Sequence, residues 1–184
     1  GVGKTTTALG LSKILGLDFR RIQFTPDVVP SDVTGFTMYD KETGEFRYRP
    51  GAVMCNMLLA DEINRTSSKT QSALLEVMEE GNVTVDGVTY KVPEPFVVIA
   101  TQNPLGTAGT QMLPESQLDR FMVRLSMGYP DIKSQVELLR DRRKQNPMEQ
   151  VHQILDGEQL MQMQQEAADV FISDEILEYI RSIS

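Results

Sequence analysis

The first six residues of the chain carry the pattern with the most specific chemistry. The string Gly1-Val2-Gly3-Lys4-Thr5-Thr6 places glycines, a lysine and hydroxyl side chains directly before a predicted helix. Glycines let the backbone curl, successive N–H groups form an anion-binding nest, and the helix adds the positive end of its dipole. Lys4 is expected to reach the β- and γ-phosphates of a nucleotide, and Thr5 to offer its hydroxyl to Mg²⁺. The sequence therefore predicts a nucleotide-phosphate site whose binding residues are Gly1, Val2, Gly3, Lys4, Thr5 and Thr6.

The match to the phosphate-loop pattern covers only its end. Gly3, Lys4 and Thr5 occupy the last three positions of G-x-x-x-x-G-K-[ST], and the first glycine of that pattern would stand before Gly1. Because a Gly-Lys-Thr-Thr string also occurs in ordinary surface turns, the interpretation needs support from a second site.

A pair of acidic residues supplies that support. Asp61 and Glu62 follow the apolar run 57–60, which is typical of a strand buried on both faces of a parallel sheet. Ligands bind at the carboxyl ends of such strands, so Asp61 is predicted to hold Mg²⁺ together with Thr5, and Glu62 to polarise an attacking water. The alternative, an acidic helix start after a core strand, is common for an acid pair alone. It becomes much less favoured when a Gly-Lys-Thr string lies upstream.

A second apolar run, 96–100, also ends in polar residues. Asn103 lies just beyond it and is predicted to position the attacking water or to sense the γ-phosphate. Taken alone, Asn103 would be read as a turn residue before Pro104.

The elements that must position these residues form an α/β pattern, read from hydrophobic periodicity and turn residues. In chain order we expect a helix over 7–15 ended by Gly16, a strand over 19–24, a loop over 26–32, a hairpin-like insertion over 35–49, a strand over 57–60, a helix over 68–80 ended by Gly81, a hairpin around Asp86-Gly87, a strand over 96–100, a loop over 105–111, a helix from Pro114, and a strand at Val123, Leu125 and Met127.

The last third of the chain has a different sequence pattern. No strand candidate follows Pro130, and residues 132–144, 157–169 and 173–182 have helical periodicity. We therefore place a domain boundary near Pro130, with an α/β core over 1–130 and a helical part over 131–184. The methionines between 148 and 163 are expected to fill the core of this helical part and not to bind a metal.

Composition excludes several classes of protein. The chain has 184 residues, a formal net charge of −8 and one cysteine, Cys55, so an internal disulfide and a multi-cysteine metal site are excluded. Cys55 is expected to be a small buried side chain and His152, the only histidine, a solvated one. No apolar run is long enough to cross a bilayer, and a cytoplasmic location is expected. The acidic balance argues against tight non-specific binding of nucleic acid.

Taken together, these residues resemble the AAA+ ATPases, and closely resemble the MoxR family within them. The motifs that carry the resemblance are Gly1-Val2-Gly3-Lys4-Thr5 as Walker A, Leu58-Leu59-Ala60-Asp61-Glu62 with Ile63-Asn64-Arg65 as Walker B, Ala100-Thr101-Gln102-Asn103-Pro104 as sensor 1, and residues 113–121 as the arginine-finger helix. Residues 22–27 and 30–35 match the family as well, so the similarity covers nearly the whole chain. By this resemblance, 35–53 is the helix-2 insert.

The resemblance implies a fold and an activity. The fold is an α/β/α P-loop core with a parallel sheet flanked by helices, followed by the start of an all-α lid. The activity is hydrolysis of ATP with Mg²⁺ in a ring of identical subunits, expected to be a hexamer. In such rings an arginine acts on the neighbouring subunit's nucleotide, and this role falls to Arg120, which would otherwise read as an ordinary cation at a helix end. The implied catalytic residues are thus Glu62, Asn103 and Arg120, with Arg65 a less certain interface residue.

The resemblance further implies chaperone-like remodelling or maturation of partner protein complexes, often with von Willebrand factor A-domain proteins. Two other functions stay open at this point. One is a nucleic-acid motor built on the AAA+ core, which the acidic balance disfavours. The other is a scaffold that does not hydrolyse nucleotide, because the first phosphate-loop glycine is not in the sequence.

Overall fold

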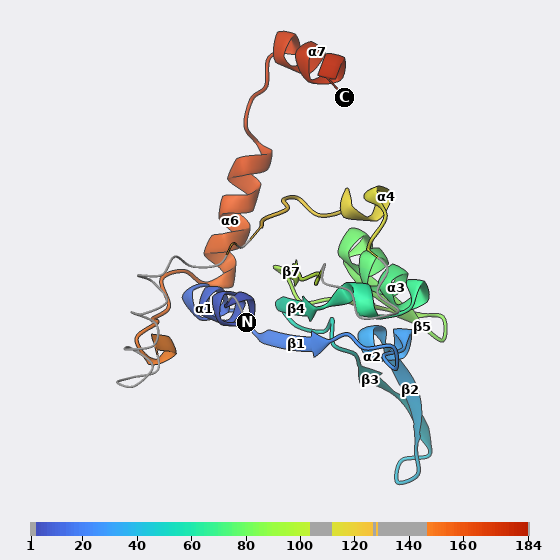
Figure 1. The fold of residues 1–184 in the computed structure, drawn as a ribbon. Helices are drawn as coiled ribbons and strands as arrows, with labels where there is room; N and C mark the ends of the chain where they lie inside the picture. Colours follow the sequence, from blue (N-terminus) through green and yellow to red (C-terminus); the bar gives the residue numbers. More distant parts are fainter. Residues whose placement is uncertain (1–2, 104–111, 127, 129–146, 184) are drawn as a thin grey trace.

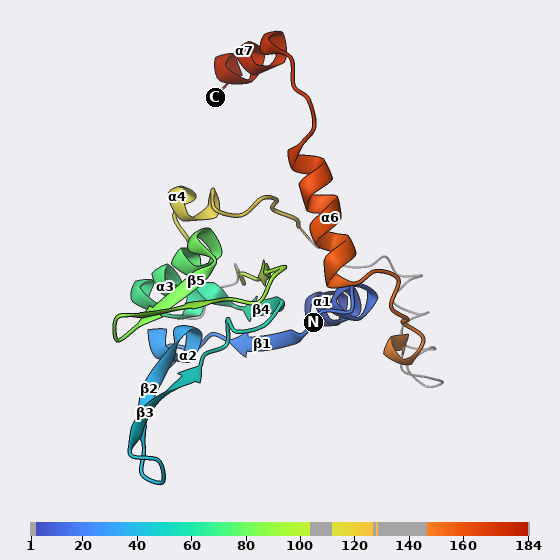
Figure 2. The same cartoon turned by 180° about the vertical axis from the view of Figure 1, so that it is seen from behind.

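The computed structural model describes residues 3–103, 112–126, 128 and 147–183. Its centre is a parallel sheet in the order β1 (Phe19–Gln23), β4 (Met57–Asp61) and β7 (Val97–Ala100). Figures 1 and 2 show this sheet between α1 on one side and the α2–α3 pair on the other. The predicted class, α/β with a parallel sheet flanked by helices, is confirmed. The four apolar residues of β4 are buried, as predicted, whereas β7 is only half-buried at the edge of the described sheet.

Helix α1 (Lys4–Ile14) opens directly after Gly3 and so begins three residues earlier than predicted. Gly3 has φ 85° and Gly16 has φ 60°, both in the left-handed region that glycine adopts without strain. The two glycines therefore delimit the helix at both ends. Ala8 is buried, but Leu11 is 39% exposed, so the predicted apolar side of this helix is only partly covered.

Helix α2 (Pro30–Thr34) occupies part of the segment predicted as a loop, and that prediction was wrong from Pro30 onward. Proline suits the first helical turn because its fixed φ is helical and its missing N–H needs no partner there. The carboxylate of Asp32 accepts a hydrogen bond from the Val29 N–H at 2.9 Å and satisfies one of the unpaired donors at the helix start.

The two predicted hairpins are both present. β2 (Gly35–Asp40) pairs antiparallel with β3 (Glu45–Pro50), and β5 (Asn82–Val85) pairs antiparallel with β6 (Val88–Lys91). The first projects from the body of the molecule (Figure 1).

Helix α3 (Ser68–Glu80) has the predicted bounds. The Ser67 side chain accepts a hydrogen bond from the Thr70 N–H at 3.3 Å, and Gly81 ends the helix at φ 66°. Leu74, Leu75 and Val77 are buried in the main core. Between β4 and α3 lies a short 3₁₀ turn, η1 (Ile63–Arg65).

The helix predicted from Pro114 is present but short, as α4 (Glu115–Leu118). The strand predicted at Val123 and Leu125 is wrong within the described residues, since 123–126 form no strand and both side chains are largely exposed, at 66% and 84%. Alternating apolar residues become a strand only when another strand pairs with them, and none of the described strands does so. Met127 and the predicted loop 105–111 lie outside the described residues.

The C-terminal part contains η2 (Pro147–Glu149), α6 (Gly157–Ala168) and α7 (Asp174–Ile183), which confirm two of the predicted helices. The third, 132–144, and the boundary near Pro130 lie outside the described residues, so the division into 1–130 and 131–184 stays a prediction. Met161 is 37% and Met163 52% exposed, so the expectation that they fill a core was wrong. Figure 1 shows α6 leaving the body beside α1 and α7 at its far end.

Cys55 is fully buried and His152 exposed, both as expected. Burial raises the pKa of the Cys55 thiol to about 11, so the thiol is protonated and inert at neutral pH. No helix among the described residues is long and apolar enough to cross a membrane.

Candidate nucleotide site

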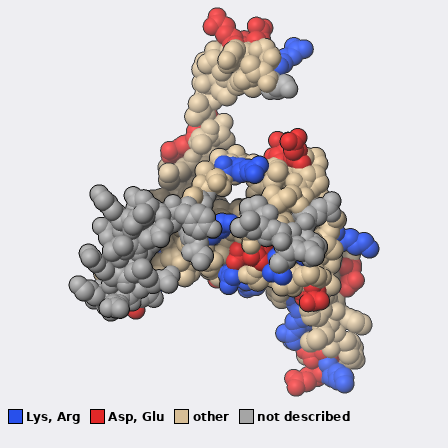
Figure 3. Space-filling model, viewed as in Figure 1, with Lys and Arg blue, Asp and Glu red and all other residues tan. Residues whose placement is uncertain are grey.

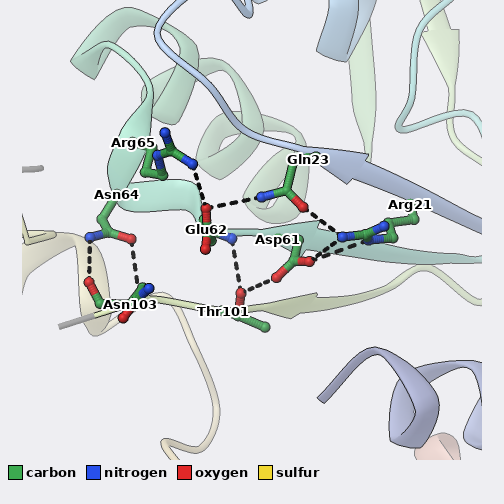
Figure 4. A network of polar contacts seen from close by, with 8 residues as sticks. All are labelled: Arg21, Gln23, Asp61, Glu62, Asn64, Arg65, Thr101 and Asn103. Carbon is green, nitrogen blue, oxygen red and sulfur yellow. Dashed lines mark hydrogen bonds and ion pairs between the residues drawn. The ribbon is translucent and has the colours of Figure 1, made fainter. Parts of the chain in front are cut away.

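The register of the parallel sheet brings polar side chains together at one edge. Gln23 of β1 lies opposite Asp61 of β4, and the pairing of Ala60 with Ala100 brings Thr101 beside Asp61. Side chains two residues apart on a strand share a face, so Arg21 lies on the same side as Gln23. Figure 4 shows these residues joined in one polar network.

Asp61 is held on both carboxylate oxygens. Oδ1 accepts a hydrogen bond from the Thr101 hydroxyl at 2.6 Å, and Oδ2 accepts from Arg21 Nη2 at 2.6 Å and Nε at 3.3 Å. Burial alone would raise the pKa of Asp61, but the hydrogen bonds from Thr101 and Arg21 and the charges of Arg21 and Lys4 outweigh it and hold the pKa below its ordinary value. Asp61 is therefore ionised at neutral pH, as a metal ligand must be.

Glu62 sits in a backbone conformation that side chains rarely adopt, with φ 56° and ψ 47°. This left-handed conformation costs roughly 1–2 kcal/mol for a residue with a Cβ, and such strain is concentrated at functional sites. The turn sends the Glu62 side chain to partners different from those of Asp61: Oε2 accepts from Gln23 Nε2 at 3.0 Å and from Arg65 Nη1 at 2.9 Å. Its N–H donates to the Thr101 hydroxyl at 2.9 Å, which fixes the backbone of the turn.

Asn103 is positioned by a residue on η1. The Asn64 side chain is 1% exposed, donates through Nδ2 to the Asn103 carbonyl at 3.2 Å, and accepts at Oδ1 from the Asn103 N–H at 3.2 Å. A primary amide matches a backbone donor and acceptor at the same time, so this pair fixes the chain at Asn103 (Figure 4).

Lys4 reaches the same edge from the first turn of α1. Its Nζ donates to the Gln102 carbonyl at 3.2 Å, and its charge contributes to the low pKa of Asp61. Thr5, next in that turn, is half-buried and Thr6 is exposed. Gly3 opens the helix, whereas Gly1 and Val2 lie outside the described residues.

These residues fit a nucleotide with Mg²⁺. A Cβ added at Gly3 would meet nothing within 4 Å, so the space beside the start of α1 is open for a phosphate. The Asp61 carboxylate and the Thr5 hydroxyl offer the oxygen ligands that Mg²⁺ takes. In the part of the chain that the structure describes, no group of three or more His, Cys, Asp and Glu side chains could hold a metal alone.

Arg120 pairs with a residue outside this network. Its Nη1 contacts Glu79 Oε2 of α3 at 2.9 Å, and the two side chains are 42% and 60% exposed. The pair borders a hollow of about 250 Å³ between α3 and α4, lined by Ser72, Leu75, Glu76, Glu79, Gln117 and Arg120. Arg120 thus pairs with α3 of the same chain, and its predicted catalytic role stays a prediction.

Sequence reasoning missed the residues that support the site. The sequence did not predict four site residues: Arg21, Gln23, Asn64 and Thr101. Three of them, Gln23, Asn64 and Thr101, lie inside the motifs that carry the family resemblance. A search for polar residues on one face at the ends of successive predicted strands could have found Gln23 and Thr101. Nothing in the sequence pairs Arg21 with Asp61.

Comparison with known proteins agrees with this geometry. Residues 1–123 match the model of the ATPase family associated with various cellular activities (AAA). The chain is 53% identical over 183 residues to the uncharacterized protein YeaC of Bacillus subtilis, covering 100% of this chain and 57% of YeaC. It is 42% identical over 180 residues to the chaperone MoxR1 of Mycobacterium tuberculosis, covering 98% of this chain and 47% of MoxR1. The protein MoxR of Methylorubrum extorquens is 32% identical over 149 residues, 78% of this chain and 43% of MoxR.

A solved structure supports the same grouping. A crystal structure from Cytophaga hutchinsonii, described as a candidate ATPase, superposes with a TM-score of 0.86 at 42% identity, over 99% of this chain and 55% of that one. The chain thus spans about half the length of the relatives it matches. By its phosphate loop, its acid pair and these relatives, the chain belongs to the MoxR family of AAA+ ATPases.

Proposed function

We propose that this chain forms the ATP-hydrolysing core of a MoxR-type chaperone that remodels or matures partner protein complexes. The observation that carries the proposal is the meeting of Lys4, Asp61 and Glu62 at the carboxyl edge of the sheet. The relative MoxR1 of Mycobacterium tuberculosis is named a chaperone. Partner remodelling is transferred from that relative and from the family.

The residues that we assign to binding and hydrolysis have distinct tasks in this proposal. Lys4 and the N–H groups of the first turn of α1 bind the phosphates, while Thr5 and Asp61 hold Mg²⁺, which neutralises charge on the phosphates. Glu62 takes a proton from, or orients, the attacking water, and Asn103, fixed by Asn64, positions that water. Gln23 and Arg65 keep the Glu62 carboxylate in place through hydrogen bonds.

The other half of the site would come from a second subunit. We propose that the chain assembles into a ring, most simply a hexamer, and that Arg120 acts on the nucleotide of its neighbour. The ion pair of Arg120 with Glu79 of α3, a residue outside the network around Asp61, supports this arrangement. Client proteins with von Willebrand factor A domains are proposed from the family alone.

The alternative of a nucleic-acid motor gains no support. The net charge is −8, and Figure 3 shows basic and acidic side chains interspersed on the face it displays. A motor that tracks a nucleic acid needs clustered lysine and arginine to neutralise phosphates.

The test is Glu62→Gln in the full-length protein. Loss of the carboxylate should lower turnover of ATP by about 100-fold or more while leaving nucleotide binding within a few-fold of wild type, because the base acts only in the chemical step. Glu178→Gln, which removes the same charge from an exposed position on α7, is the matched control and should change neither quantity. Unchanged turnover in Glu62→Gln would refute the assignment.

A further inference from the structure

One cation in the network has no task in the proposed hydrolysis. Arg21 on β1 donates two hydrogen bonds to Asp61 Oδ2, from Nη2 at 2.6 Å and from Nε at 3.3 Å. The Asp61 side chain is 14% exposed and that of Arg21 is 44% exposed. A permanent positive charge therefore lies against the carboxylate to which we assign Mg²⁺.

The guanidinium is held from a second side as well. Arg21 Nη2 also donates to Gln23 Oε1 at 2.6 Å, and Gln23 Nε2 donates to Glu62 Oε2 at 3.0 Å. A glutamine between a guanidinium and a carboxylate satisfies both only with its oxygen toward the first and its nitrogen toward the second. Two acceptors thus fix Arg21 on Asp61, and the contact is not a free surface ion pair.

Both oxygens of Asp61 already have donors. Oδ1 has the Thr101 hydroxyl, which is neutral, and Oδ2 has Arg21, which carries a full charge. A second cation at this carboxylate meets repulsion from the guanidinium, reduced by solvent because Arg21 is partly exposed.

We propose that Arg21 is the built-in counter-ion of Asp61, a positioning residue that orients the carboxylate and lowers the affinity of the site for Mg²⁺. The inference rests on the proposed nucleotide function. Its consequence is selectivity: with Asp61 already compensated, Mg²⁺ binds well only when nucleotide phosphates add their negative charge.

The experiment measures the Mg²⁺ dependence of nucleotide binding in the full-length protein. Fluorescent methylanthraniloyl-ADP is titrated at a series of Mg²⁺ concentrations, so that hydrolysis plays no part. Arg21→Gln, which removes the charge and keeps a hydrogen-bond donor, should lower the Mg²⁺ concentration for half-maximal binding by about tenfold. Arg21→Lys, which keeps the charge but loses the two-nitrogen contact, should shift the Mg²⁺ requirement much less than Arg21→Gln does.

Matched controls separate this effect from a general change in charge. Arg20→Gln removes the same charge at the adjacent position of β1, where the side chain donates to the Gly51 carbonyl at 3.2 Å, and should leave the Mg²⁺ dependence unchanged. In an Asp61→Asn background Arg21→Gln should have no further effect on the Mg²⁺ dependence, because the partner is gone.

The outcomes distinguish this inference from the function beneath it. An unchanged or raised Mg²⁺ requirement in Arg21→Gln, with wild type binding the nucleotide normally, overturns the role of Arg21 alone. Failure of wild type to bind methylanthraniloyl-ADP at any Mg²⁺ concentration overturns the proposed function instead. A melting curve checks that Arg21→Gln folds, and Arg21→Met, which also removes the charge, repeats the titration if it does not.

Discussion

The carboxyl edge of the sheet and the α4 segment hold the two kinds of residue that the proposed reaction needs, and they are built differently. At the sheet edge, the Asp61 carboxylate accepts three hydrogen bonds, one from Thr101 and two from Arg21, and the Glu62 carboxylate accepts two, from Gln23 and Arg65. On the segment that begins with α4, Arg120 has one ion pair among the described residues, with both side chains substantially exposed.

The difference fits the roles that we propose for the two regions. Binding of phosphates and Mg²⁺ requires groups that are already in place, since preorganised groups need no reorganisation during reaction. A residue that acts on a neighbouring subunit needs a weak contact within its own subunit, which it can exchange for a stronger contact across the interface. An exposed pair, worth less than about 1 kcal/mol, is such a contact.

The largest effect is expected at Arg120. Arg120→Ala should lower ATP turnover on the order of 1,000-fold, because a trans-acting arginine stabilises charge on the transferred phosphate. Mixing Arg120→Ala subunits with Glu62→Gln subunits should restore part of the activity, since some sites then combine an intact Glu62 with an intact Arg120. Steady-state phosphate release measures both, and absence of any rescue would refute a site shared between subunits.

A loss of stability is expected at Asn64. Asn64→Ala removes a buried amide together with its two hydrogen bonds to the backbone of Asn103, which should cost about 1–3 kcal/mol in the free energy of unfolding. Asn82→Ala, which removes a single exposed contact to the Glu80 carbonyl, should cost less than about 0.5 kcal/mol. Urea denaturation compares the two, and equal costs would mean that the sheet edge is no more preorganised than the surface.

A smaller change is expected at Glu79. Glu79→Gln removes the ion-pair partner of Arg120 within the same chain and should change the free energy of unfolding by less than about 1 kcal/mol. Glu76→Gln, on the same helix and beside the same hollow, is the matched control. A loss well above 1 kcal/mol, seen only for Glu79→Gln, would show that Arg120 is anchored as firmly as the sheet edge.

The smallest effect is expected in the pH dependence. Because the pKa of Asp61 is held below its ordinary value of 3.8, the ionised carboxylate contributes stability that is fully present above that value and is lost as pH falls through the lowered pKa. The difference in unfolding free energy between wild type and Asp61→Asn should therefore stay constant from neutral pH to about pH 5 and shrink in stronger acid. Denaturant curves across this range test the sign, and a difference that grows in acid would contradict it.

Local signals predicted the elements that depend on near neighbours. Helix α3 has the predicted bounds and ends at Gly81 as predicted, and Asp86-Gly87 forms the predicted turn. Prediction failed where an element depends on distant partners: the alternation at Val123 and Leu125 formed no strand, and the methionines of α6 stayed exposed. Hydrophobic periodicity in a sequence indicates which side chains share a face of a helix or strand. It does not indicate whether another element packs against that face.

For the site, the sequence by itself determined the reactive residue types and their order along the chain: Lys4, the acid pair and Asn103. Their spacing after a glycine turn and two apolar strands sufficed for the chemistry and the family. The tertiary structure decided the partners, because the parallel register of β1, β4 and β7 sets Arg21, Gln23 and Thr101 beside carboxylates distant in the sequence. Register arises from the packing of the whole sheet, and for that reason the charge balance of Asp61 could be read only in the fold.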